Sequence, residues 1–166
     1  MRQLLLAGLL LATAALAEAQ NANPIIGSWK LNPEKSQFPT KQHTQMEIRQ
    51  YRERSDGYLV GLAIFVDASG SPGFSQFTVK SDGNFYPEYN ADAISELSVN
   101  GYATPLAYAE KFTGERLIDW TDKRNGTVVS SGTTQISDDG KQLFIIVNNP
   151  GHHGQPSTYT LVYDRQ

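Results

Sequence analysis

The residues with the clearest potential for chemistry are two adjacent histidines, His152 and His153, in the glycine-rich stretch 150–154. Neutral imidazole is a good ligand for zinc, copper and nickel, so a metal site is the sharpest interpretation of the pair. The chain has three histidines and no cysteine, and a closed site would need carboxylates such as Glu88 or Asp92. No third ligand stands at a recognisable spacing. A polar hairpin loop therefore explains the pair better, and we expect no metal and no cofactor.

Catalytic groups are equally hard to assemble from the sequence. The chain has no thiol and no Gly-x-Ser-x-Gly turn, and no spacing singles out a pair of carboxylates as acid and base. Glu110 and Lys111 are neighbours in an expected strand and point to opposite faces. A buried Glu110 would need a partner, for which Arg116 on the next strand is the candidate. An enzyme that uses His43, His152 or His153 at the mouth of the fold as acid or base is the less favoured hypothesis.

The elements that must position these residues are short strands separated by turns. Gly, Asn and Asp tolerate the backbone angles of tight hairpins, and they recur at fairly even spacing. The intervening segments are rich in Val, Ile, Tyr, Phe and Thr, which favour strands. The segment 91–98 fits either a helical turn or a loop. We expect nine or ten strands, beginning near Ile25, Thr44, Tyr58, Phe74, Asn84, Leu106, Glu115, Thr127, Gln142 and Thr158.

The series of hairpins predicts an all-β fold in one domain. A chain of 166 residues leaves little room for a second domain. Many consecutive hairpins leave exposed strand edges unless the sheet closes on itself. The fold class that we predict is an antiparallel up-and-down β-barrel of about 8–10 strands.

The N-terminus has the features of a secretory signal peptide. A basic start at Arg2 is followed by an apolar run over 4–16 and by small residues up to Ala19. The run is shorter than the roughly 20 residues that cross a bilayer, so an anchor is the poorer interpretation. We expect residues 1–19 to be the signal, with Ala17 as the alternative cleavage site, and residues 20–166 to form the barrel in the periplasm or outside the cell.

Charge and patterning disfavour two kinds of partner. The formal net charge is −3, whereas a nucleic-acid partner or an anionic membrane surface would favour a basic face. A membrane-spanning barrel would need strands that are apolar on one side throughout. The polar segments 47–54 and 127–134 do not fit this pattern. We therefore expect no nucleic acid, and no membrane span once the signal is removed.

The start of the barrel carries a recognisable motif. Gly27-x-Trp29 on the first expected strand resembles the opening of the lipocalin and calycin barrels. Residues 29–32 and 35–36, with the ending 161–166, resemble a group of small secreted bacterial proteins of unknown function that are usually described as lipocalin-like. The resemblance covers the chain beyond the signal. It implies that Trp29 packs across the closed end of the barrel against a basic residue from a late strand, either Arg165 or Arg116, with Gly27 and Trp29 as structural anchors.

Alternation within the strands suggests what faces the barrel interior. In 46–51, Met46 and Ile48 lie on one side and the charges on the other. A small barrel is either filled by side chains or holds one small ligand. If it holds one, we expect a lining formed by Ile48, Leu62, Ile64, Phe77, Tyr108, Ile118, Trp120 and Tyr159.

The sequence favours one function and leaves a second open. The first is an exported lipocalin-like protein that binds a small apolar or amphipathic ligand without transforming it. The alternative is a filled barrel that acts as an interaction or structural domain of the cell envelope. An exposed apolar patch within 58–66 would favour this alternative. Nothing in the sequence indicates the oligomeric state.

Overall fold

The fold is a closed antiparallel barrel of ten strands. In the computed structural model, residues 23–41, 43–90, 106–151 and 155–166 are described. Within these ranges every regular element is a strand, and none is a helix long and apolar enough to cross a membrane. The strands are β1 (Gly27–Leu31), β2 (Met46–Glu53), β3 (Leu59–Val66), β4 (Pro72–Val79), β5 (Tyr86–Asn90), β6 (Leu106–Gly114), β7 (Leu117–Arg124), β8 (Thr127–Ile136), β9 (Gln142–Asn149) and β10 (Ser157–Arg165).

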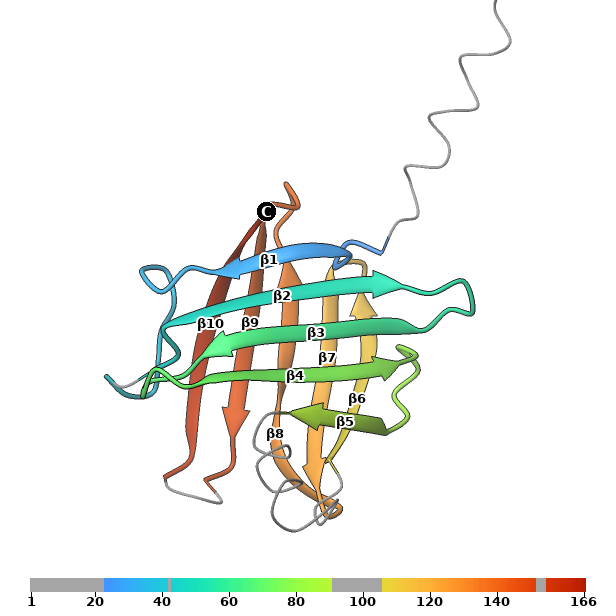
Figure 1. The fold of residues 1–166 in the computed structure, drawn as a ribbon. Coiled ribbons are helices and arrows are strands. Elements are labelled where there is room, and N and C mark those ends of the chain that lie inside the picture. The colour runs from blue at the N-terminus through green and yellow to red at the C-terminus, as the bar shows by residue number, and fades with distance from the viewer. Residues whose placement is uncertain (1–22, 42, 91–105, 152–154) are drawn as a thin grey trace, which may run out of the picture.

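Each strand pairs with its neighbours in the chain, and β1 closes the barrel by pairing with β10. Strands β1 to β4 cross one side of the barrel at a steep angle to β6 to β10 behind them (Figure 1). The predicted fold class is confirmed, and the ten observed strands begin within two residues of the expected positions. The segment 91–98 lies outside the described residues.

The turns follow the chemistry expected of hairpins. Asn125 and Gly126 join β7 to β8 with φ angles of 50° and 79°. Two consecutive positive φ angles define the tight turn that matches the twist of paired strands. Glycines at other hairpins, including Gly57 and Gly140, also have positive φ. The turn residues therefore fix where each strand reverses.

One end of the barrel, at which β1 begins, is sealed around Trp29. The Trp29 side chain is 0% exposed, and its Nε1 donates a hydrogen bond to the carbonyl of Ile25 at 2.8 Å. The guanidinium of Arg165 lies over the indole, 4.1 Å from its centre. Arg165 also donates hydrogen bonds to the carbonyls of Pro24, Ile26 and Gly140. Between the two expected basic partners, the structure selects Arg165. We call this region the Trp29 end.

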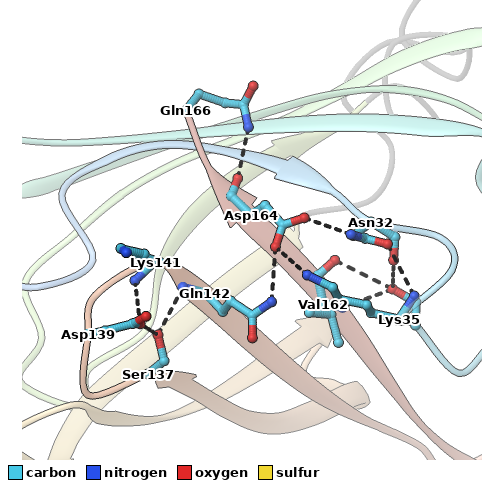
Figure 2. Close-up of polar contacts among 10 residues, drawn as sticks. Asn32, Lys35, Ser137, Asp139, Lys141, Gln142, Val162, Asp164 and Gln166 are labelled. Atoms are coloured by element: carbon cyan, nitrogen blue, oxygen red, sulfur yellow. Dashed lines mark hydrogen bonds and ion pairs between the residues drawn. The ribbon is translucent and has the colours of Figure 1, made fainter.

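The other residues of the N-terminal motif fasten β1 to β10 (Figure 2). The carboxylate of Asp164 accepts hydrogen bonds from Asn32 at 2.6 Å, Gln142 at 3.0 Å and Lys35 at 3.1 Å. These donors lower the pKa of Asp164 to about 2. Ser36 accepts a hydrogen bond from the backbone N–H of Val162 at 2.9 Å. The motif that carries the family resemblance is therefore a structural seam.

A continuous core fills much of the barrel. Among the described residues, the members of this buried apolar cluster come from every strand except β5 and β6, and the segment before β1 adds one more. Apolar area removed from water contributes roughly 25 cal/mol per Å², which makes this set the main source of stability in a chain with no disulfide. The cluster comprises Ile25, Trp29, Leu31, Tyr51, Leu59, Phe77, Val79, Ile118, Trp120, Ile136, Leu143, Ile145, Val147 and Tyr163.

Candidate functional site

A small cavity lies inside the barrel, bordered by the Ile25 side chain. Its volume is about 100 Å³, several times the roughly 30 Å³ that one water molecule occupies in the liquid. Drug-sized ligands occupy pockets of roughly 300 Å³ or more. The cavity therefore suits a compact molecule or one group of a larger molecule. Its walls combine an aromatic row with a set of ionisable side chains.

The aromatic row consists of Tyr51, Phe77, Tyr108 and Trp120, from strands β2, β4, β6 and β7. Phe77 stacks on Tyr108 with ring centres 4.2 Å apart, and Tyr108 faces Trp120 at 6.5 Å. The OH of Tyr108 donates to the carboxyl of Glu110 in the same cavity, so its ring edge is fixed. Together the rings give one wall an apolar surface that flat or aliphatic groups can contact.

Two glycines make room for this row. A Cβ on Gly61 would collide with the ring of Phe77, and a Cβ on Gly132 would collide with the Ile146 carbonyl and the Trp120 ring. Both glycines belong to the inward-facing sets of β3 and β8. Their missing side chains let Phe77 and Trp120 lie flat against the barrel wall, which leaves the space in front of them open.

Asp122 and Glu88 form a pair of facing carboxyls in the cavity wall. Ser130 donates to Asp122 Oδ2 at 2.9 Å, and Ser75 donates to Glu88 Oε1 at 2.6 Å. Burial, together with the charge and hydrogen bonding of Glu88, raises the pKa of Asp122 to about 8. Ser130 and Arg49 oppose this rise. A proton held on Asp122 at neutral pH relieves the repulsion between the two groups.

A local irregularity of the sheet positions Asp122. The register of β7 against β8 shifts between Asp122 and Lys123, where Asp122 is opposite Ser130 but Lys123 is opposite Val128. Such bulges redirect side chains and are over-represented near functional sites. Here the bulge follows directly after the Asp122–Ser130 pair.

Glu110 is a third cavity carboxyl and is 2% exposed. It accepts hydrogen bonds from Ser81 at 2.6 Å and from Tyr108 at 3.1 Å. Burial raises the pKa of Glu110, and these two donors oppose the rise. The expectation that Arg116 partners Glu110 is wrong, because the Arg116 guanidinium donates instead to the carbonyl of Ser137. Hydroxyl donors satisfy the carboxyl without a cation.

Arg49 is the one cation among the cavity-lining residues that the structure describes. Its Nε lies 2.6 Å from Glu47 Oε1, and Glu47 is 6% exposed. The guanidinium also donates to Tyr51 at 3.4 Å and lies 5.3 Å from the centre of the Tyr163 ring. Glu47 therefore balances the charge of Arg49.

Two buried polar atoms at the cavity have no hydrogen-bond partner among the described residues. They are the indole Nε1 of Trp120, a residue 8% exposed, and Oδ1 of Asp122. Burying an unpaired polar atom costs free energy. Trp120 Nε1 is a donor, whereas the Asp122 carboxyl, which interacts with the Glu88 carboxyl, accepts when it is ionised. A ligand with an acceptor and a donor would satisfy both groups.

Some of the expected ligand-binding residues surround this cavity. Phe77, Tyr108, Ile118 and Trp120 line it. Tyr159 packs against the buried core, and it is not among the residues that line the cavity. That the four lining residues bind a ligand stays a prediction.

Ile48, Leu62 and Ile64 do not face the cavity, and their expected inward orientation is wrong. Ile48 and Ile64 are 37% and 50% exposed and lie opposite each other on β2 and β3. Leu62 shares their face of β3. The inward side of β2 carries Glu47, Arg49 and Tyr51 instead, because the ion pair and its hydrogen bonds make burial of these polar groups possible.

The polar side of the cavity was not predicted from the sequence. Glu88 stood out only as one of several carboxylates, and Arg49 and Asp122 were not singled out. A signal existed in the alternation of β2, where Glu47, Arg49 and Tyr51 occupy every second position of one face. Taking the apolar face as the inner one hid this signal.

The histidines do not build a second site within the described ranges. The His43 ring stacks on Phe38 with centres 3.8 Å apart, and its Nδ1 lies 2.9 Å from the carbonyl of Thr44. His152 and His153 lie outside the described residues. Among the residues that are described, no three His, Asp or Glu side chains form a group that could hold a metal ion.

The geometry defines a class: closed ten-stranded antiparallel barrels with an internal cavity. Neither a family model nor a curated protein matches the sequence, but solved structures match the fold. A mutant of the fluorescent protein UnaG has a TM-score of 0.55 at 11% identity, covering 84% of this chain and 94% of UnaG. Rv2717c from M. tuberculosis has a TM-score of 0.55 at 13% identity, and the match covers 92% of this chain and 98% of the Rv2717c chain. At these identities the likeness shows the barrel fold alone.

Proposed function

We propose that this chain binds a small amphipathic molecule in the barrel cavity without transforming it. One observation carries the proposal: the aromatic row and two unpaired polar atoms, Trp120 Nε1 and Asp122 Oδ1, meet around the same space. A ligand with an apolar body and polar groups would cover the rings and pair both atoms. A purely apolar ligand would leave both atoms unpaired, and this favours the amphipathic class.

The surroundings of the carboxyls favour recognition over reaction. Glu88, Glu110 and Asp122 each accept a hydrogen bond from a neighbouring serine. These bonds hold the side chains in fixed positions, as a binding site requires. The same fixed geometry would orient the polar group of a ligand against the aromatic row.

The proposal is tested by native mass spectrometry of the full chain purified from its natural source, followed by organic extraction. We expect a discrete added mass that disappears on unfolding and whose extract binds again to the refolded protein. The control is the same purification of the Trp120→Ala variant, which should retain less of the added mass. A clean apo mass, combined with no rebinding of any extracted molecule, would contradict the proposal.

Export to the periplasm or the medium is part of the same proposal. Its support is the basic, apolar and small-residue pattern of residues 1–19. The intact mass of the secreted protein should correspond to a chain that begins at Gln20, or at Glu18 if cleavage follows Ala17. A chain that retains Met1 in the cytoplasmic fraction would contradict export and leave the binding proposal unaffected.

A second candidate function, an interaction domain, has an observation of its own. Met46, Ile48 and Ile64 are large apolar residues that lie exposed on the outer faces of β2 and β3. Contiguous exposed apolar groups often mark contact surfaces. Light scattering of the full chain and of Ile64→Asp tests for self-association. An oligomer that the substitution dissociates supports this candidate, and a monomer at all concentrations contradicts self-association through this face.

A further inference from the structure

The charges around the cavity do not balance. Glu88, Glu110 and Asp122 line it, and Arg49 is the one Lys, Arg or His among the described lining residues. Glu47 already neutralises Arg49 at 2.6 Å. Three carboxyls therefore line a small space, and none of them forms an ion pair with a described Lys, Arg or His. Arg124 lies two residues beyond Asp122 on β7, and its Nε is buried and has no hydrogen-bond partner among the described residues. Buried carboxylates require protons, donors or a counter-charge.

The hydrogen bonds show the same imbalance. Ser130 donates to one oxygen of Asp122, and the other oxygen, Oδ1, has no donor among the described residues. Glu88 Oε1 has Ser75 as its donor. A carboxylate has about four acceptor positions, so the pair can accept further hydrogen bonds. A group with several N–H donors matches it better than an acceptor does.

We propose that the cavity selects a small organic cation, a protonated amine, whose ammonium binds between Asp122 and Glu88 while its apolar part lies against Tyr108 and Trp120. This inference rests on the proposed function and names its ligand class. The ammonium would supply the missing counter-charge and up to three donors. Aromatic faces attract cations within about 6 Å, so the row favours the same class. The unpaired Trp120 Nε1 remains available for an acceptor on the ligand.

A bound proton takes the place of the cation when the cavity holds no ligand. Burial and Glu88 raise the pKa of Asp122 to about 8, so Asp122 is protonated at neutral pH. Besides Glu88, Arg49 and Glu110 line the same cavity, and Arg124 is two residues further along β7. Arg124 forms no ion pair with a described residue. An entering ammonium favours ionised Asp122, so binding releases a proton at pH values below about 8.

Isothermal titration calorimetry with three probes of similar shape tests this inference. Benzylamine, benzyl alcohol and benzoate share one ring and differ in charge. We expect benzylamine to bind the full chain at least about tenfold more tightly than either of the others. Its affinity should increase by up to about tenfold per pH unit between pH 6 and 8, the limit for release of one proton, and then level off.

Substitutions test whether benzylamine affinity depends on the carboxyls of Asp122 and Glu88. Asp122→Asn keeps the shape and removes the charge, so benzylamine affinity should decrease at least about tenfold and lose its pH dependence. Asp119→Asn is the matched control, because Asp119 lies on the exposed face of the same strand. This variant should bind benzylamine as tightly as the unsubstituted protein does. If Asp122→Asn does not fold, Glu88→Gln and the pH profile of the unsubstituted protein provide the same test.

The outcomes separate this inference from the proposed function. Benzyl alcohol or benzoate binding as tightly as benzylamine would overturn the cation inference and leave a ligand-binding barrel. Benzylamine binding that Asp122→Asn and Glu88→Gln leave unchanged would also overturn it. No binding of any probe, together with a clean apo mass from the natural source, would overturn both.

Discussion

The two tryptophans of this chain lie in opposite environments. At the Trp29 end, the indole N–H has a carbonyl partner and Arg165 covers the ring. At the cavity, the Trp120 N–H has no partner among the described residues, and the ring borders open space. The first region has its polar groups satisfied within the chain, whereas the second does not. The contrast separates a part of the barrel that provides stability from a part that leaves a polar group and a ring face open to the proposed ligand.

The largest expected effect is on stability at the Trp29 end. Trp29→Ala removes a fully buried side chain and should cost about 3–5 kcal/mol of unfolding free energy. Trp120→Ala should cost less by about 1 kcal/mol or more, because the Trp120 ring lacks packing contacts on its cavity side and its buried N–H is unpaired among the described residues. Urea unfolding of both variants measures the difference. Equal costs would mean that the two regions do not differ as described.

The next effect concerns the glycines that make room for the aromatic row. Gly61→Ala should push Phe77 into the cavity, and Gly132→Ala should push Trp120 and the chain at Ile146, each at a cost of about 1–3 kcal/mol. Both should also weaken binding of any ligand that co-purifies with the unsubstituted protein. Gly114→Ala is the control, because its new Cβ would meet only Leu117 at 3.4 Å. Thermal unfolding and rebinding assays on the three variants give the comparison.

A more gradual effect, spread over several pH units, is the pH dependence of stability that Asp122 contributes. The pKa of Asp122 is raised in the folded protein, so the folded state holds a proton that the unfolded chain releases above about pH 4. This contribution is fully present below the unfolded pKa and is lost as the pH rises to about 8. The free energy of unfolding should decrease by no more than about 1.4 kcal/mol per pH unit. Urea unfolding across this range should show the loss in the unsubstituted protein and not in Asp122→Asn.

The smallest effect belongs to Asp164 in the seam between β1 and β10. Its pKa is lowered to about 2, so its contribution is present above the unfolded pKa and is lost as the pH falls towards 2. Because Asp164 is partly exposed and screened by solvent, Asp164→Asn should cost at most about 1 kcal/mol. A loss larger than that of Trp29→Ala in the same unfolding assay would contradict the account of the Trp29 end.

The sequence was sufficient to predict the barrel, because turns and strand composition are local signals. Asn125-Gly126 and similar dipeptides determine where the chain reverses whatever the rest of the fold does. The Trp29 anchor was also visible in the motif. The motif did not show whether Arg165 or Arg116 covers Trp29, because this depends on which late residue reaches the Trp29 ring in three dimensions.

The cavity was predicted only in part, because its polar half depends on contacts between distant strands. Asp122 on β7 and Glu88 on β5 meet only in the closed barrel. The alternation of β2 predicted that its apolar side faces inward. The ion pair between Glu47 and Arg49 reverses this expectation. Local hydrophobicity cannot show that two charges will be buried together.

The most direct test follows the indole N–H signals of the two tryptophans by nuclear magnetic resonance. Benzylamine, benzyl alcohol and benzoate are added in turn to the full ¹⁵N-labelled chain, and Trp120→Phe assigns the signals. A small molecule bound in the cavity should shift the Trp120 signal and leave the Trp29 signal, which is hydrogen-bonded to Ile25, nearly unchanged. Saturable binding that shifts Trp29 and leaves Trp120 in place would contradict the proposed site.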